Sequence, residues 1–478
     1  MKFSACLAVL LFPLLSSALA AHAAPSLDKA RTCHLPGSEE PLRCLTVKVP
    51  LDYAAPANTL ALHVTVAPAF RESARPDPLF ILAGGPGQAG SDLLPFLDTV
   101  FRRVRATRDI VFIDQRGTGL SGKLDCASKP EHEAMTDEQL DTVAADCIKG
   151  LGKQYAAYTT ANAARDIEMV RKAIGYGQIN LWGGSYGTRL GQEYARAFPA
   201  QVRSLVLDGV AAPDQIIPAG GVDGKAALDG LFRACAQDSA CNKAFPALRT
   251  EFDALVARLG AGPVEVSLAN PRTTLPLRES MTRTRFLSTV HSVLYSPLDS
   301  RRLPYMIHSA YQGRWEPFVA RRNASGDFAT DGPISMVLHV AVVCAEDYPR
   351  LTPQLAAEDA RASLLAVGIV QRMAGMCKAA NVPPVPLRAP SRIEAPVLML
   401  SGALDPVTPP RRAEAAGKHM ARAQHVVVTH AGHGISQLGC GPRLLRSFLD
   451  NPAQKLDAKC LSEIPAPTFQ VGSAGPHP

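Results

Sequence analysis

The sequence predicts an α/β fold in which a mostly parallel sheet is covered by helices and interrupted by a largely helical insertion. Short apolar runs alternate with amphipathic stretches up to residue 211, a pattern typical of buried parallel strands and their covering helices. The alternation stops over residues 212–388 and resumes after the proline-rich stretch "NVPPVPLRAP". A chain of 478 residues is long enough for one large core and an inserted unit.

The first 24 residues predict a cleaved export signal. Lys2 precedes an apolar stretch that ends in small residues with the A-x-A pattern. No later apolar run approaches the roughly 18 residues of a membrane span. We therefore expect a soluble, secreted or periplasmic protein without a membrane partner. Its core is divided into residues 25–211 and 389–478 by the cap insertion at 212–388.

The cysteine count supports an oxidising compartment. Cys6 leaves with the signal, and the ten others fall in neighbouring couples, which favours disulfides in an exported chain. Nearest-neighbour pairing is a hypothesis, because sequence alone does not determine connectivity. A zinc site is the alternative, but neither C-x-x-C nor H-E-x-x-H occurs, so we expect no metal and no cofactor. The couples are Cys33 with Cys44, Cys126 with Cys147, Cys235 with Cys241, Cys344 with Cys377, and Cys440 with Cys460.

The charge pattern argues against a nucleic-acid partner. The net charge of +7 is thinly spread, and the main local cluster is "RRVRATR" at 102–108. A nucleic-acid interface would require a basic face interleaved with aromatic residues. A solvated helix face explains the cluster better.

The first core segment opens with a predicted hairpin. Its strands cover 45–53 and 61–70, joined by a loop at 54–59, at the edge of the sheet. Parallel strands follow at 78–85, 109–117, 179–185 and 204–210, with helices between them. The helix at 162–176 places Ala164, Ile167, Val170 and Ile174 on one face.

The stretch "LWGGSYGTRL" (181–190) places three glycines around Ser185. A tight structural turn would explain the glycines without any chemistry. The segment Gly183–Gly187 also fits the G-x-S-x-G elbow, which exposes a nucleophilic serine between a strand and a helix. The buried strand before it and the amphipathic helix after it favour the elbow.

A serine nucleophile requires a base and an orienting carboxylate. Asp405 follows the strand in "VLMLSGALDPVTPP", where Thr408 is placed to cap the next helix, and His433 follows the strand in "VVVTHAGHGIS". The alternatives are Asp208, on an earlier strand, and His430. We predict Asp405 and His433.

Acyl transfer also requires donors for an oxyanion. The loop "LAGGPGQAG" (82–90) offers backbone N–H groups, of which Gly85 is the best candidate, and Tyr186 follows the nucleophile. A structural turn is the alternative. Pro86 and the absence of G-x-x-x-x-G-K argue against a phosphate cradle.

The ordered set of motifs resembles a known family. The motifs "GGPGQAG", "DIVFIDQRGTGLSG", "GGSYGTRLGQEYARAFP", "GALDPVTP" and "AGHG" are similar to those of secreted α/β-hydrolase peptidases related to proline iminopeptidase, in the tripeptidyl aminopeptidase branch. The resemblance implies an α/β-hydrolase fold, with Ser185, Asp405 and His433 as the triad and Gly85 and Tyr186 as oxyanion donors. Ala83 stands where a histidine often precedes the glycines, which weakens the case for narrow proline specificity.

The resemblance also points to substrate-binding residues in the cap. Such peptidases hold the substrate's α-amino group with acidic residues, which implies Glu346 with Asp347 beside it; a solvated acidic pair is the alternative. We interpret Asp114 and Arg116 as loop supports. The Asn323-Ala324-Ser325 sequon matches by pattern only.

Three functions are compatible with these residues. The first is an exported serine aminopeptidase acting on peptides, and the second is an esterase or amidase acting on small acyl substrates. The third, a binding protein on an inactive scaffold, is disfavoured by the intact nucleophile and base. Residue preference and oligomeric state stay open.

Overall fold

The computed structural model describes residues 27–127, 129, 132, 135–269, 274, 276–323, 334–362, 367–386 and 390–475. The predicted export signal, Cys6 and residues 324–325 of the sequon lie outside these ranges. None of the helices in the described ranges has the length and apolar character needed to cross a bilayer.

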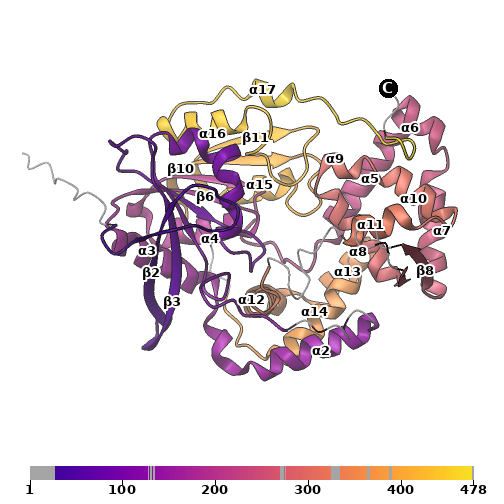
Figure 1. Ribbon diagram of the computed structural model, residues 1–478, viewed down its shortest axis with the longest axis horizontal. Coiled ribbons are helices and arrows are strands. Elements are labelled where there is room, and N and C mark those ends of the chain that lie inside the picture. The colour runs from indigo at the N-terminus through magenta and orange to yellow at the C-terminus, as the bar shows by residue number, and fades with distance from the viewer. Residues whose placement is uncertain are drawn as a thin grey trace, which may run out of the picture.

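A nine-stranded sheet organises the core (Figure 1). Its spatial order is β1-β2-β3-β5-β4-β6-β7-β10-β11. The strands β5, β4, β6, β7, β10 and β11 are parallel to one another. The strands β1, β2 and β3 pair antiparallel, and β3 also pairs antiparallel with β5. The strands are β1 (Arg31–Cys33), β2 (Leu42–Asp52), β3 (Ala55–Ala67), β4 (Leu79–Leu82), β5 (Ile110–Ile113), β6 (Ile179–Gly184), β7 (Val202–Asp208), β10 (Ile393–Gly402) and β11 (Met420–Val428).

The predicted hairpin is present, but its predicted loop is wrong. β2 and β3 stay paired as far as Asp52 and Ala55, so residues 55–59 belong to a strand rather than to a connection. Pro56 is exposed at this end of the ribbon, where a missing N–H is tolerated. The hairpin is also not the last element of the sheet, because β1 pairs with β2 outside it.

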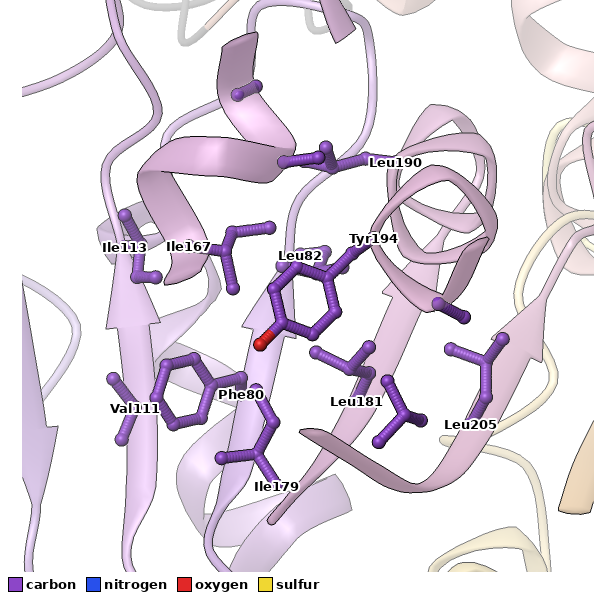
Figure 2. Close-up of a cluster of buried hydrophobic side chains, with 14 of the residues drawn as sticks. Phe80, Leu82, Val111, Ile113, Ile167, Ile179, Leu181, Leu190, Tyr194 and Leu205 are labelled. Atoms are coloured by element: carbon purple, nitrogen blue, oxygen red, sulfur yellow. The ribbon is translucent and has the colours of Figure 1, made fainter. Parts of the chain in front are cut away.

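Helices cover both faces of the sheet. Figure 2 shows one face, where Ile167, Leu190 and Tyr194 pack on Phe80 and Leu181. The helix at 160–174 buries all four of its predicted apolar residues. The first face carries α3 (Thr160–Ile174), α4 (Tyr186–Ala197) and α15 (Pro410–Gly417), and the second carries η1 (Ser91–Phe96), η2 (Leu97–Phe101), α1 (Arg102–Arg105) and α16 (Gly441–Asp450).

The residues between β7 and β10 form a mostly helical insertion with its own apolar core. It also contains a two-stranded sheet that the sequence pattern did not predict. Its elements are α5 (Gly221–Gln237), α6 (Ser239–Ala244), α7 (Leu248–Ala261), β8 (Val264–Ala269), β9 (Pro276–Met281), α8 (Arg283–Leu294), α9 (Pro297–Ser300), α10 (Leu303–Tyr311), α11 (Glu316–Asn323), α12 (Met336–Val342), η6 (Val343–Asp347), η7 (Tyr348–Arg350), α13 (Pro353–Ala362) and α14 (Val367–Ala380).

Two segments from outside the insertion pack against it. Ile148 of α2 (Asp137–Gly150), together with Tyr155 of η4 (Gly152–Ala157), packs with Met373 and Met376 of α14. Near the other end of the chain, beyond α17 (Lys459–Ser462), Phe469 joins the core of the insertion. The insertion therefore packs with residues from outside the predicted range 212–388 as well as with its own.

Five disulfides join the ten cysteines of the described chain, and the nearest-neighbour pairing is confirmed in every couple. The bridge between Cys344 and Cys377 connects η6 to α14. It therefore anchors the segment that carries Glu346 and Asp347.

Candidate active site

Ser185 lies on a sharp turn between β6 and α4. Its backbone has φ 54° and ψ −124°, a conformation that costs energy in a non-glycine residue and clusters at functional sites. A Cβ on Gly187 would lie 2.0 Å from the Leu82 carbonyl oxygen, so only glycine permits this close packing of helix against strand. The Ser185 N–H donates to the Asp208 carbonyl at 2.9 Å. The turn thus has the geometry of a nucleophile elbow.

The structure brings Asp405 and His433 together. Asp405 follows β10, His433 follows β11, and Nδ1 of His433 lies 2.8 Å from Oδ2 of Asp405. The backbone N–H groups of Val407 and Thr408 donate to the other Asp405 oxygen at 2.9 and 2.8 Å. The carboxylate side chain is fully buried. It is therefore fixed by the turn that follows it.

Thr408 does not cap the next helix, so that prediction is wrong. The residue before α15 is Pro409, which provides no side-chain cap. The Thr408 hydroxyl instead donates to Asp405 Oδ2 at 2.7 Å and lies 3.1 Å from His433 Nδ1. The buried carboxylate is the stronger acceptor for a hydroxyl one turn away.

The two partners have opposite pKa shifts. Burial raises the pKa of Asp405, but the charge and hydrogen bond of His433 and the Thr408 donors lower it by more. Burial lowers the pKa of His433, but Asp405 raises it by more, with a contribution from Asp208. The arrangement therefore favours the ionised carboxylate and a basic imidazole. With Nδ1 held by Asp405, Nε2 is the nitrogen left to exchange a proton.

Asp208, the alternative acid, supports the loop that carries His433. Its two oxygens accept from the N–H groups of Ile435 and Ser436 at 2.8 and 2.7 Å. A Cβ on the neighbouring Gly209 would lie 2.9 Å from Cε1 of His433. Because the Asp208 carbonyl also binds the Ser185 N–H, the end of β7 lies between the serine turn and the histidine ring. Asp405 contacts His433 rather than His430.

The glycine-rich loop borders Ser185. A Cβ on Gly84 would lie 3.1 Å from the Ser185 Cβ. The Gly84 N–H donates to Oε1 of Gln88 at 3.2 Å. Because that N–H is already used, the N–H of Gly85 is the next candidate donor in the loop. Tyr186 is the first residue of α4, so its N–H has no partner within the helix. Tyr186 therefore directly follows the serine, and Gly85 follows the glycine that borders it, while their role as oxyanion donors stays a prediction.

Asp114 and Arg116 have the contacts expected of loop supports. Asp114 accepts from the backbone N–H groups of Ser91 and Leu120. Arg116 donates to both oxygens of the buried Asp166 at 2.7 and 2.6 Å. These hydrogen bonds join both side chains to other parts of the core and not to Ser185.

Glu346 and Asp347 lie on η6, a π-helical segment at the end of α12, and such segments are frequent at functional sites. Their environments differ. Asp347 is fully buried, with both oxygens on Arg189 at 2.9–3.0 Å and a further contact to Arg350. Glu346 accepts from the Thr160 N–H and hydroxyl, each at 2.6 Å, and has no ion pair within the described chain.

The Thr160 hydroxyl links Glu346 to the serine turn. It lies 2.7 Å from the hydroxyl of Tyr186, the residue after Ser185. Burial raises the pKa of Glu346, and the Thr160 donors and Arg189 offset only part of that effect. Thr160 is not among the residues predicted from the sequence; its only local signal is its position two residues before the predicted amphipathic helix at 162–176.

Known proteins similar to this chain include hydrolases. Serine protease Hip1 of Mycobacterium tuberculosis (strain H37Rv) is 28% identical over 414 residues, which cover 77% of this chain and 76% of that protein. Tripeptidyl aminopeptidase of Streptomyces coelicolor is 30% identical over 228 residues, 43% of this chain and 42% of the relative. Carboxylesterase B of Mycobacterium tuberculosis is 35% identical over 191 residues, 36% of each chain.

A protein-family model described as alpha/beta hydrolase fold matches residues 77–437. That range includes every strand from β4 to β11 and the whole insertion. No group of three or more histidine, cysteine or acidic side chains in the described ranges is placed to hold a metal ion. The predicted fold class is confirmed: the chain belongs to the alpha/beta hydrolase fold family, and it is a serine hydrolase.

Proposed function

We propose that the protein is an exported aminopeptidase that cleaves peptides near a free N-terminus through an acyl-enzyme on Ser185. The observation that carries the proposal is the ionic hydrogen bond between Asp405 and His433 beside the strained Ser185 turn, with Glu346 linked to that turn through Thr160. The five disulfides favour an oxidising compartment.

The proposed reaction has two steps. Oγ of Ser185 attacks the scissile carbonyl while Nε2 of His433 takes its proton, and the oxyanion accepts from the N–H groups of Gly85 and Tyr186. His433 then returns the proton to the leaving amine, which departs with the C-terminal part of the peptide. In the second step a water activated by His433 hydrolyses the ester, which frees the N-terminal fragment and Ser185.

Glu346 is the proposed partner of the substrate's α-amino group. That group has a reference pKa of about 7.7 to 8.0 and is therefore largely protonated at neutral pH. An ionised carboxylate has about four acceptor sites, and Thr160 occupies two of those on Glu346. We do not extend this role to Asp347, because its oxygens are already paired with arginines in a fully buried site.

The names of two relatives favour a peptidase. Serine protease Hip1 matches over most of its length, and tripeptidyl aminopeptidase matches over less than half of its own. Carboxylesterase B also matches part of the chain. An esterase or amidase acting on small acyl groups is therefore the second candidate function.

The decisive comparison uses one peptide with a free and with an acetylated N-terminus, together with a simple ester. We expect acetylation to remove most of kcat/KM. Glu346→Gln should lower kcat/KM for the free peptide by roughly 30-fold or more, which corresponds to about 2 kcal/mol, and should hardly affect kcat/KM for the ester. Glu358→Gln is the matched control, since Glu358 is an exposed glutamate of α13 that binds only Gln354 among the described residues.

Two outcomes would change the assignment. Equal rates on the free and acetylated peptides would exclude aminopeptidase action and support the esterase. An equal loss on all three substrates in Glu346→Gln would show that Glu346 stabilises the fold rather than binding an amine.

A further inference from the structure

The helical insertion reaches the loop that carries His433. Tyr295, immediately after α8, accepts the His433 N–H at its carbonyl oxygen at 2.8 Å. Its ring lies edge-on to the His433 ring, with centroids 5.2 Å apart and planes at 73°. One residue of the insertion therefore contacts both the backbone and the imidazole of the proposed base.

The contact is close enough to constrain the loop. A Cβ on Gly432 would lie 2.3 Å from the Tyr295 carbonyl oxygen and 3.1 Å from Cδ of Pro297, so only glycine fits between the loop and the insertion. On the core side, Asp405 and Thr408 hold Nδ1 of His433. The ring is thus held between the sheet edge and the insertion.

His291, the titratable group of α8 that packs against Tyr295, adds no positive charge beside it at neutral pH. His291, one turn earlier on α8, packs edge-on against Tyr295 at 5.5 Å. Burial lowers the pKa of His291 to about 4, despite the nearby Asp405. It is therefore neutral at neutral pH, and the charges that act on His433 are those of Asp405 and Asp208.

We propose that Tyr295 is a positioning residue that orients the His433 ring, so that the insertion supplies part of the catalytic geometry as well as covering the site. The proposal rests on the proposed role of His433 as the base. An edge-to-face aromatic pair favours one ring orientation over others. Small displacements of a catalytic group can lower a rate by about 100-fold, so loss of this contact should affect turnover more than substrate binding.

The test compares Tyr295→Ala and Tyr295→Leu with Tyr295→Phe. The backbone hydrogen bond to His433 survives in all three variants, so only the side chain is tested. We expect Phe to stay within about threefold of wild type. The Ala and Leu variants should lose about 10- to 100-fold in kcat with little change in KM. They should also shift the acid limb of the pH–rate profile, which a merely structural role would not move. Tyr311→Ala removes a partly exposed tyrosine elsewhere in the insertion and is the matched control.

The rate of labelling by a fluorophosphonate separates the two proposals. If wild type is not labelled at Ser185, the proposed function fails. If wild type is labelled and the folded Ala and Leu variants react at the same rate and with the same pH profile, Tyr295 has no positioning role. Circular dichroism verifies folding, and Leu, which retains apolar volume, replaces Ala if Ala does not fold.

Discussion

The sheet edge and the helical insertion each contain one carboxylate of the candidate site, and the two carboxylates differ in how many hydrogen bonds they accept. Asp405 at the sheet edge receives four hydrogen bonds, from Val407, Thr408 and His433, and its pKa is lowered. Glu346 in the insertion receives two, both from Thr160, and burial raises its pKa. The carboxylate proposed to orient the base therefore has its acceptor sites filled by the protein, whereas the one proposed to bind an amine retains unfilled acceptor sites.

Ser185→Ala should have the largest effect, because it removes the proposed nucleophile and leaves both carboxylates in place. We expect turnover to fall on the order of 10⁴- to 10⁶-fold. The fold and the binding of free-amine peptides should persist, as measured by circular dichroism and calorimetry. Ser288→Ala, on an exposed serine of α8, is the control. Retention of a tenth of wild-type turnover would refute the assignment of Ser185.

Thr408→Val tests how much the Thr408 hydroxyl contributes to orienting Asp405 at the sheet edge. It removes one donor to Asp405 without changing the volume of the side chain. Hydrogen bonds to charged groups contribute about 1.5–3 kcal/mol, so kcat should fall roughly 10- to 100-fold. Thr408→Ser retains the hydroxyl and should stay near wild type. Equal rates for Val and Ser would show that the backbone N–H groups alone orient Asp405.

The smallest effect is a pH dependence in which the activity and the His433 contribution to stability have opposite trends. The base must be neutral, and the pKa of His433 is raised. Activity should therefore increase with pH, up to tenfold per unit, with a midpoint above the reference value of about 6.5.

Stability follows from the same shifts. The contribution of His433 is full below its unfolded pKa of about 6.5 and is lost as the pH rises through the raised folded value. The contribution of Asp405, whose pKa is lowered, is present above its unfolded pKa of about 3.9 and is lost as the pH falls through the folded value. Denaturant titrations across pH measure both. His433→Gln should abolish the decrease in stability above pH 6.5, and an unchanged decrease would assign it to other groups.

The features that the sequence predicted correctly involve residues that lie close together along the chain. The strand, the glycines and the helix around Ser185 occupy one continuous stretch, so local sterics specify the elbow. The disulfides join cysteines separated by 6 to 33 positions, and each pairs with its nearest neighbour. Asp405 and His433 follow consecutive parallel strands, whose carboxyl ends meet at one edge of the sheet.

The contacts that the insertion makes with the core depend on long-range packing, which the sequence pattern does not specify. Glu346 meets Thr160 across 186 positions, and Asp347 meets Arg189 across 158. The sequence presents the two acids as equivalent neighbours. Helix packing pairs Asp347 with arginines, whereas Glu346 has no ion pair with any residue that the structure describes. Thr408 and Tyr295 likewise acquire their contacts with His433 from segments that meet only in the folded chain. The positions of the parallel strands follow from the local apolar pattern, whereas the packing of the helices depends on side-chain contacts between distant segments that no local pattern encodes.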